Sequence, residues 1–350
     1  MQEVAPGVLW VRMALPFLLD HVNLYLLEDG PGWMLIDTGI DDSRTRDAWT
    51  VLFDGPLAGR TVTRLILTHC HPDHLGLAGW LSDRFGPTLL MSRTEYLMAQ
   101  NIRFNSEGIG SAAHRAFYVR RGLQGEAVDA ILDRGHAYLR MTSGLPPTFT
   151  RLLAGETLEI GGRTFEVLTG GGHSPEQAML LCRADKLFFA ADQVLARISP
   201  NVSVWPWEPE EDPLGEYLRS LRALQADVPG DVLVLPAHNL PFRGLHRRLE
   251  ELGAHHRTRL AALVEACIDG PRTDAELIPA LFRRQLDAHQ MGFAFGETVA
   301  HVNRLVRDGT LVREAGPDGV VRVRAAGGRD RAPGGQEAAV PFSMPKVERA

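Results

Sequence analysis

The sequence predicts an α/β fold in which two mixed β-sheets stack face to face and helices cover their outer sides. Short apolar runs typical of buried strands alternate with stretches of helical periodicity through residues 1–245. Several apolar runs end at a histidine or an aspartate, where α/β proteins commonly place ligands. Hydrophobic residues make up 45% of the 350-residue chain, which is enough for one large domain and a smaller one.

The first half of the sandwich is expected from residues 7–91. Three strand-like runs precede the first helix, and a Gly- and Pro-containing turn at residues 28–32 separates two of them. Helices and strands then alternate. The expected strands cover residues 8–11, 21–27, 33–36, 65–67 and 88–91, and the expected helices cover residues 41–53 and 76–85.

Residues 94–150 form an expected helical insertion. They contain two or three helices that are rich in Arg and carry scattered Met and aromatic residues. These apolar side chains could pack the insertion onto the sandwich, or the insertion could cap the substrate pocket, and the sequence leaves both interpretations open. His114 and His136 are expected to be surface or core residues rather than ligands.

The second half of the sandwich is expected from residues 156–238. Gly161 and Gly162 connect its first two strands as a hairpin, and residues 212–225 have the periodicity of an amphipathic helix. Trp205 and Trp207 lie in an irregular loop, where they either line the pocket or hold the loop in place. The expected strands cover residues 156–160, 164–168, 178–182, 187–190 and 232–235.

A smaller domain is expected at residues 246–325, where three helices precede a β-hairpin. Thr273 and Glu276 have the spacing of a capping box at the start of the second helix. Residues 326–350 are rich in Gly, Ala, Pro and charge, so we expect a disordered tail. The expected helices cover residues 247–268, 273–284 and 296–307, and the hairpin strands cover residues 311–313 and 320–323.

The strongest chemical signal is a cluster of metal-ligand side chains directly after the apolar run at residues 65–67. His69, His71, Asp73 and His74 fall within six residues. One metal ion rarely takes four ligands from one short loop, so two neighbouring metals, each completed from elsewhere, fit the cluster better.

The missing ligands are expected at other strand ends, and the sequence offers His173, Asp192 and His238 there. A lone buried His is more often a core residue than a ligand, so the prediction depends on the whole set. Imidazole and carboxylate ligands favour two divalent zinc ions, with iron or manganese as alternatives. Cys70 lies between two ligands and is expected to point away from the metals.

The order of these residues resembles the metallo-β-lactamase superfamily, in particular its glyoxalase II-like and beta-lactamase-like protein 2 group. The resemblance covers roughly residues 5–245 and begins with Asp37, which would order the site. It implies an αββα sandwich and assigns the ligands. By resemblance, His69, His71 and His173 hold the first metal, Asp73, His74 and His238 hold the second, and Asp192 bridges both.

Three positions depart from the superfamily's common pattern. Ala191 precedes Asp192 where many members have Gly, Asn239 follows His238, and Glu176 follows the His-Ser-Pro sequence. All seven ligand positions are retained, so these departures are expected to affect substrate choice more than metal binding.

The C-terminal segment resembles a winged-helix domain, a module that follows the sandwich in the same group. Many winged helices bind DNA, but residues 250–324 carry ten Arg against eleven acidic residues and offer no basic stripe. We therefore expect this domain to serve packing or contacts in a homodimer, and we expect no nucleic-acid partner.

The resemblance implies a metal-dependent hydrolase in which a metal-bridging hydroxide attacks an ester, lactone or thioester carbonyl of a small-molecule substrate. Asp73 and Asp192 would be the catalytic residues, orienting the hydroxide and relaying a proton. A small ribonuclease or phosphodiesterase is one alternative, although only 45 residues separate Asp192 from His238, too few for the domain that long-insertion nucleases carry there. An iron-dependent sulfur dioxygenase-like oxidoreductase and a metal-stabilised scaffold are the others.

Composition indicates the cellular setting. The net charge of −6 gives no basic excess, and three scattered cysteines without a Cys-x-x-Cys pair favour reduced thiols in a cytoplasmic protein. No apolar stretch approaches the roughly 20 residues of a membrane span. The N-terminus also lacks the pattern of a signal peptide, so we expect no membrane association.

Overall fold

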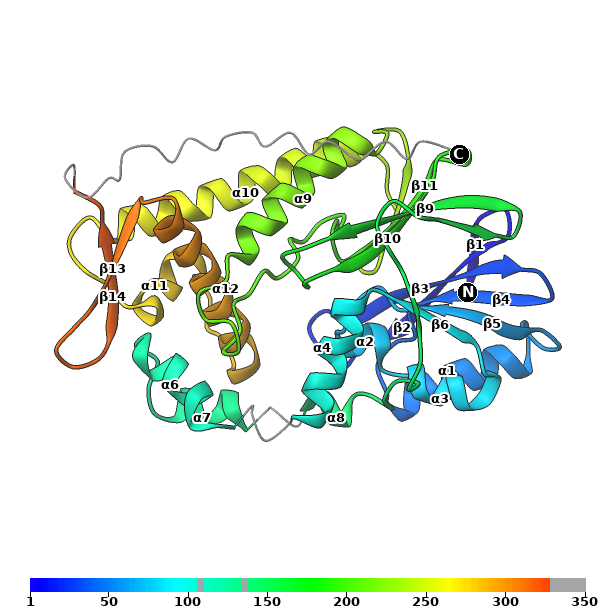
Figure 1. Cartoon of the computed structure of the whole chain (residues 1–350), viewed down its shortest axis with the longest axis horizontal. Helices are drawn as coiled ribbons and strands as arrows, with labels where there is room; N and C mark the ends of the chain where they lie inside the picture. The colour runs from blue at the N-terminus through cyan, green and yellow to red at the C-terminus, as the bar shows by residue number, and fades with distance from the viewer. Residues whose placement is uncertain (106–109, 134–136, 328–350) are drawn as a thin grey trace, which may run out of the picture.

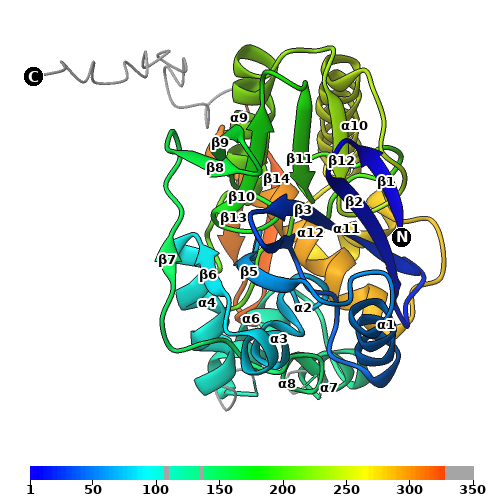
Figure 2. The ribbon, with the colours of Figure 1, turned by 90° about the vertical axis from the view of Figure 1, so that its right-hand side faces the viewer.

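The computed structural model describes residues 1–105, 110–133 and 137–327. Two β-sheets stack face to face, and helices cover the outer side of each (Figures 1 and 2). The first sheet has seven strands in chain order, with β4, β5, β6 and β7 parallel to one another. Its strands are β1 (Gln2–Ala5), β2 (Val8–Ala14), β3 (His21–Asp29), β4 (Gly32–Ile36), β5 (Thr61–Ile66), β6 (Thr88–Met91) and β7 (Thr150–Arg151).

The second sheet has five strands in the order β12-β11-β10-β9-β8. Its β8–β9 hairpin turns at Gly161 and Gly162, both with positive φ, which glycine adopts without strain. Only the β11–β12 pair is parallel. The strands are β8 (Thr157–Ile160), β9 (Arg163–Gly170), β10 (Gln177–Cys182), β11 (Leu187–Ala191) and β12 (Leu233–Pro236).

Alternation along the central strands places one set of side chains between the sheets and the other beneath the helices. In β3, Tyr25 packs between the sheets, whereas its neighbour Leu24 packs against α1 (Ser43–Asp54) and α3 (Ala78–Phe85). In β10, Leu180 faces the first sheet, and Leu181 packs toward α9 (Pro213–Asp227). Both faces of each sheet are therefore buried, which explains the continuous apolar runs in the sequence.

The helical insertion divides between the two halves of the molecule. Helix α4 (Arg93–Phe104) packs on the first sheet through Tyr96, whereas α6 (Ala112–Arg120) places Phe117 and Tyr118 against Phe295 of the C-terminal helices. Phe117 and Tyr118 thus serve packing. The insertion also contains α7 (Glu126–Leu132) and α8 (Ala137–Arg140), and the predicted His136 lies outside the described residues.

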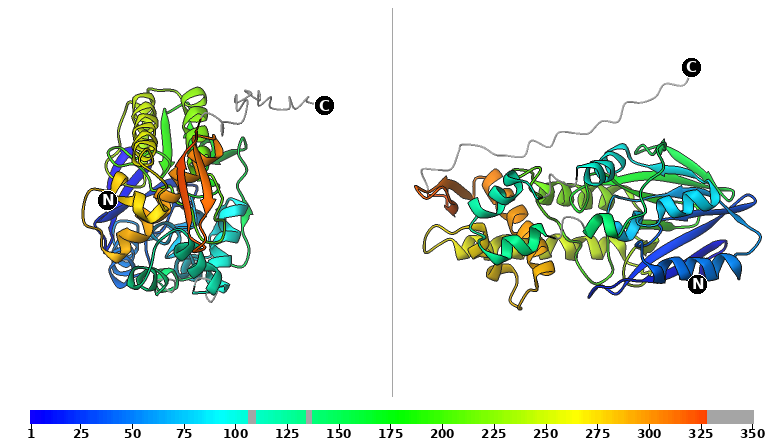
Figure 3. Two further views of the ribbon diagram at one scale, coloured as in Figure 1. Left: turned by 90° about the vertical axis from the view of Figure 1, so that its left-hand side faces the viewer. Right: turned by 90° about the horizontal axis from the view of Figure 1, so that it is seen from below.

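Three helices and a hairpin form the C-terminal segment, which lies at one end of the molecule, opposite the N-terminal strands (Figure 3). Thr273 and Glu276 form the predicted capping box at α11. Whether this segment is a winged helix stays a prediction. The elements are α10 (Leu245–Ala266), α11 (Asp274–Leu281), α12 (Ala288–Arg307), β13 (Leu311–Ala315) and β14 (Val321–Ala325).

Helix α12 begins eight residues before the predicted start at Gly296. Asp287 caps it by accepting a hydrogen bond from the Gln290 backbone N–H, so the helix starts there and Gly296 lies in its interior. A Cβ at Gly296 would lie 2.9 Å from the Ser203 side chain. The glycine therefore lets the loop after Asp192 approach the helix closely. Across the described part of the chain, no helix has the length and apolar character needed to cross a membrane.

Candidate metal centre

The predicted ligands lie in loops that follow four strands. The loop after β5 carries His69 and His71 and runs into the short helix α2 (Pro72–Leu75), which carries Asp73 and His74. The loop after β9 carries His173, and Asp192 directly follows β11. His238 follows β12. The parallel pairs β4–β5 and β11–β12 direct their carboxyl ends to the same edge of the sandwich, where these loops meet.

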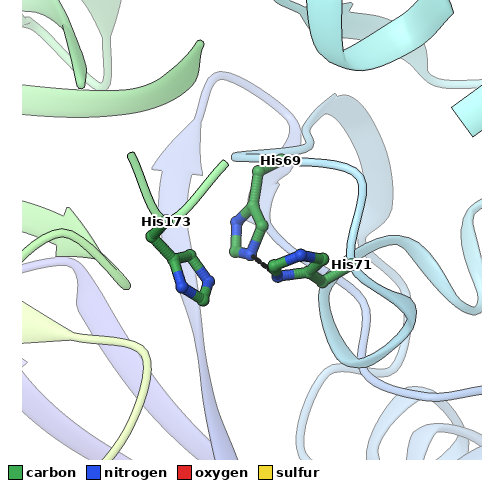
Figure 4. A group of neighbouring side chains, drawn as sticks. All are labelled: His69, His71 and His173. Atoms are coloured by element: carbon green, nitrogen blue, oxygen red, sulfur yellow. Dashed lines mark hydrogen bonds between the residues drawn. The ribbon is translucent and has the colours of Figure 1, made fainter. Parts of the chain in front are cut away.

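His69, His71 and His173 form a first group (Figure 4). Nε2 of His69 lies 2.9 Å from Nδ1 of His71, and the rings of His71 and His173 are 4.6 Å apart. One nitrogen from each residue lies within 4.8 Å of the other two. The three imidazoles thus surround a space of the size that one cation occupies.

Asp73, His74 and His238 form a second group with the same spacing. Oδ2 of Asp73 lies 3.4 Å from Nε2 of His238 and 3.7 Å from Nε2 of His74. This group contains a carboxylate in place of the third imidazole.

Asp192 lies between the two groups. Its Oδ2 is 3.2 Å from Nε2 of His173 and 3.6 Å from Nε2 of His74, whereas its Oδ1 is 3.4 Å from Nε2 of His238. Asp192 also forms a group with His69 and His74. One carboxylate therefore contacts residues of both groups.

The residues present fit a pair of divalent cations. Nε2 of His74, Nε2 of His173 and Oδ1 of Asp192 are buried and have no hydrogen-bond partner. An unsatisfied buried polar atom costs about 1–3 kcal/mol, and two cations, one in each group, would together satisfy all three. The imidazole and carboxylate donors suit zinc and can also hold iron or manganese.

Three ligand histidines have their ring orientation fixed by a partner at Nδ1. That atom lies 2.8 Å from the Asn201 carbonyl in His173, 2.7 Å from the His21 carbonyl in His238, and 2.8 Å from Oδ2 of Asp37 in His74. In each case Nδ1–H donates, so Nε2 is the nitrogen that is directed into the centre.

Asp37 supports the ligand loop in a second way. It has a φ of 63°, unusual for a residue other than glycine, and its carboxylate accepts hydrogen bonds from the Thr68 backbone N–H and hydroxyl. The strained backbone is held by these contacts. The geometry matches the ordering role that the family resemblance implies for Asp37.

The electrostatics of the two groups differ. Burial and the neighbouring imidazoles hold the pKa of His69 well below its usual value and lower the pKa of His71 to about 3. Burial also opposes the charged forms of His74 and His238, but the nearby carboxylates outweigh it. These carboxylates hold the pKa of His74 well above normal and raise the pKa of His238 to about 10. A cation entering the second group would thus displace protons.

Several residues at the centre were missed by sequence reasoning. Asn201 and His21 act through backbone carbonyls, for which residue type gives no signal. Glu95 lies in α4, far from any motif, yet it contacts two ligand loops. Sγ of Cys70 lies 3.9 Å from Oγ of Ser174, and Cys70 belongs to none of the metal-binding groups found among the described residues.

Comparison with known proteins agrees with this geometry. A family model described as the metallo-beta-lactamase superfamily matches residues 18–238, and a model described as the metallo-beta-lactamase-like C-terminal domain matches residues 260–326. The probable metallo-hydrolase YqjP of Bacillus subtilis is 25% identical over 313 residues, covering 85% of this chain and 92% of its own.

Two solved structures are similar over nearly the whole chain. A beta-lactamase domain protein from Burkholderia ambifaria is 44% identical, with a TM-score of 0.84 and 93% of each chain covered. A metallo-beta-lactamase family protein from Thermus thermophilus is 30% identical, with a TM-score of 0.79, covering 92% of this chain and 100% of that one. The predicted fold class is confirmed, and the chain belongs to the metallo-beta-lactamase superfamily as a metal-dependent hydrolase.

Proposed function

We propose that the protein is a dinuclear hydrolase that cleaves ester, lactone or thioester bonds of a small molecule. One observation carries the proposal: Asp192 lies between two groups of three ligand side chains, and one buried atom of each group and one of Asp192 have no hydrogen-bond partner. In this proposal His69, His71 and His173 hold the first ion, Asp73, His74 and His238 hold the second, and Asp192 contacts both.

Two divalent cations in these groups would supply Lewis acidity at the substrate oxygen and lower the pKa of water toward ~7, giving a nucleophile at neutral pH. The chain's own residues hold the reactants and move protons. Oδ2 of Asp192 lies near His173 of the first group and His74 of the second, so this side chain would help to set the spacing between the two groups.

Asp73 is the better placed of the two carboxylates to exchange a proton. Its side chain is 21% exposed, whereas that of Asp192 is 8% exposed. Oδ2 of Asp73 faces His74 and His238, so Oδ1 is the oxygen left to accept the proton of the attacking water and return it to the leaving alkoxide or thiolate. Asp192, enclosed by histidines, serves as an acceptor that keeps its charge.

We also propose zinc as the metal and a reducing, cytoplasmic setting. The donor set supports zinc, and Cys70, Cys182 and Cys267 are free and buried, as in proteins of reducing compartments. A homodimer contact through the C-terminal segment stays a prediction.

The test is a hydrolysis panel of lactones, thioesters, aryl esters, phosphodiesters and RNA, run on protein of measured metal content. We expect carbonyl substrates to be cleaved, activity to disappear on metal stripping, and zinc to restore it. An Asp192→Asn variant should be inactive under the same conditions. Cleavage of phosphodiesters or RNA alone would favour the nuclease alternative, and iron-dependent oxygen consumption would favour the dioxygenase.

A further inference from the structure

Glu95 is a fully buried carboxylate in the first turn of α4, behind the metal centre rather than in it. Its Oε2 accepts a hydrogen bond from the Cys70 backbone N–H at 2.9 Å, and its Oε1 accepts one from the Glu176 backbone N–H at 2.8 Å. The hydroxyl of Ser174 lies 2.7 Å from both oxygens. Three donors from two separate loops thus converge on one side chain.

These donors belong to the loops that carry the first ligand group. Cys70 lies between His69 and His71 in the chain, and Ser174 directly follows His173. The hydrogen bonds of Glu95 therefore tie together the two loops on which all three ligands of the first group stand. The backbone of Asp73, His74 and His238 makes none of these bonds.

A second contact holds the same loop from the insertion. The hydroxyl of Tyr138, in α8, donates to the Cys70 carbonyl at 2.8 Å. Cys70 is thereby held at its N–H by α4 and at its carbonyl by α8. The insertion fixes the backbone between His69 and His71 from both sides, which gives its first and last helices a role at the metal centre.

Asp37, unlike Glu95, has contacts that lead to both metal-binding groups. It contacts His74 directly and reaches the first group through Thr68, whose hydroxyl lies 3.0 Å from Nδ1 of His69. A change at Asp37 would disturb both groups. The hydrogen bonds of Glu95, in contrast, go to the two loops that carry the first group.

We propose that Glu95 is a positioning residue for the first metal-binding group, so that its loss selectively weakens the binding of one of the two ions. Hydrogen bonds to a carboxylate are stronger than neutral ones, and residues supporting metal ligands typically affect metal affinity by 10–100-fold. The proposal rests on the two-metal function above.

The experiment is a metal titration of the full-length Glu95→Gln variant. Glutamine keeps the volume and one acceptor oxygen but places an NH₂ group against the donors of one loop, so a single side chain no longer accepts hydrogen bonds from both loops. We expect wild-type protein to bind two cobalt ions, and Glu95→Gln to bind one with unchanged affinity and the other about 10–100-fold more weakly. The absorbance that decreases in the variant should be that of cobalt in the site with three histidines.

Matched variants separate this effect from general destabilisation. Asp274→Asn makes the same chemical change at a buried carboxylate that contacts Arg121 and no ligand loop, so it should lower the melting temperature yet retain two ions. Ser174→Ala and Tyr138→Phe remove one hydrogen bond each and should weaken the binding of the same ion to a smaller extent. Ser174→Ala removes a hydrogen bond of Glu95 itself, so it tests the inference even if Glu95→Gln fails to fold.

Unchanged binding of both ions by Glu95→Gln, or equal weakening of both, would overturn the inference. If wild-type protein bound only one ion, the two-metal function would fail instead. The positioning role of Glu95 would then still be supported if the Glu95→Gln variant bound that ion more weakly, and it would be refuted if binding were unchanged. The two proposals therefore fail through different results.

Discussion

The insertion is joined to the C-terminal helices by a buried ion pair between Arg121 and Asp274. Nη1 of Arg121 lies 2.8 Å from Oδ2 of Asp274, and the two side chains are 5% and 2% exposed. Arg121 also donates to the Pro209 carbonyl and to Glu210, whose side chain is 68% exposed. Asp274 has no hydrogen-bond partner at its Oδ1. Removing Asp274 thus leaves Arg121 with two other acceptors, whereas removing Arg121 takes away the hydrogen bond to Oδ2 of Asp274, whose Oδ1 already has none.

This inequality sets the expected magnitudes. Arg121→Met removes the cation from a buried carboxylate and should lower the free energy of unfolding by about 3–5 kcal/mol. Asp274→Asn leaves Arg121 two acceptors and should lower it by about 1–3 kcal/mol. For a chain of this length, the first change corresponds to a fall of about 4–7 °C in melting temperature. The Arg121→Met/Asp274→Leu double variant should recover most of the loss, because no unpaired charge remains buried.

The assay is thermal unfolding of these four proteins and of Asp274→Leu at fixed, saturating metal, followed by circular dichroism. The double-mutant cycle of wild type, Arg121→Met, Asp274→Leu and Arg121→Met/Asp274→Leu then isolates the coupling between the two side chains. The reasoning would be refuted if Arg121→Met lowered stability by less than about 1 kcal/mol, or by no more than Asp274→Asn does.

Three further predictions concern the metal centre and the buried histidines. Removing the metals with a chelator should abolish hydrolysis and lower the melting temperature, and zinc should restore both, as checked by metal analysis and calorimetry. Asp192→Asn should reduce kcat by at least about 100-fold and also lower metal content. Loss of activity with both ions retained would show that Asp192 acts in the reaction and is not needed to hold the metals. Burial lowers the pKa of His256 to about 2 and of His301 to about 3, whereas a histidine in the unfolded chain has a pKa of about 6.5. Below about pH 6.5 the unfolded state therefore binds more protons than the folded state does. Stability should therefore drop by about 2 kcal/mol per histidine between pH 7 and pH 5, and His301→Gln should lose about 2 kcal/mol less than wild type in denaturant titrations.

The ligand loops could be located from sequence because their signal is local. A buried strand produces an apolar run, and a His or Asp at its end stands out against that run, as at His173 and His238. Residue type and order then supplied the family resemblance, which the comparisons confirm for the superfamily. The assignment of each side chain to an ion remains a prediction.

The two edge strands of the first sheet, β1 and β7, were missed for a physical reason. β1 is short and partly polar, and β7 has two residues, so neither has the alternation that predicts a strand. Each forms because a neighbouring strand offers unpaired backbone groups, β2 for β1 and β6 for β7. Pairing of this kind depends on tertiary structure rather than on intrinsic propensity.

Glu95 and Arg121 could not be recognised for a related reason. Both look like ordinary charged residues in sequence, Glu95 within α4 and Arg121 directly after α6, and each becomes buried only when segments distant in the chain meet it. The partners of Glu95 lie 25 and 79 or more residues away, and Asp274 lies 153 residues from Arg121. Local pattern carries no information on such contacts.

The most direct test of the account is a crystal structure of the zinc-loaded protein with anomalous scattering measured at the zinc edge. The account predicts two peaks per chain: one among His69, His71 and His173, and one among Asp73, His74 and His238, both in contact with Asp192. A single peak, or peaks outside these groups in a catalytically active protein, would contradict it.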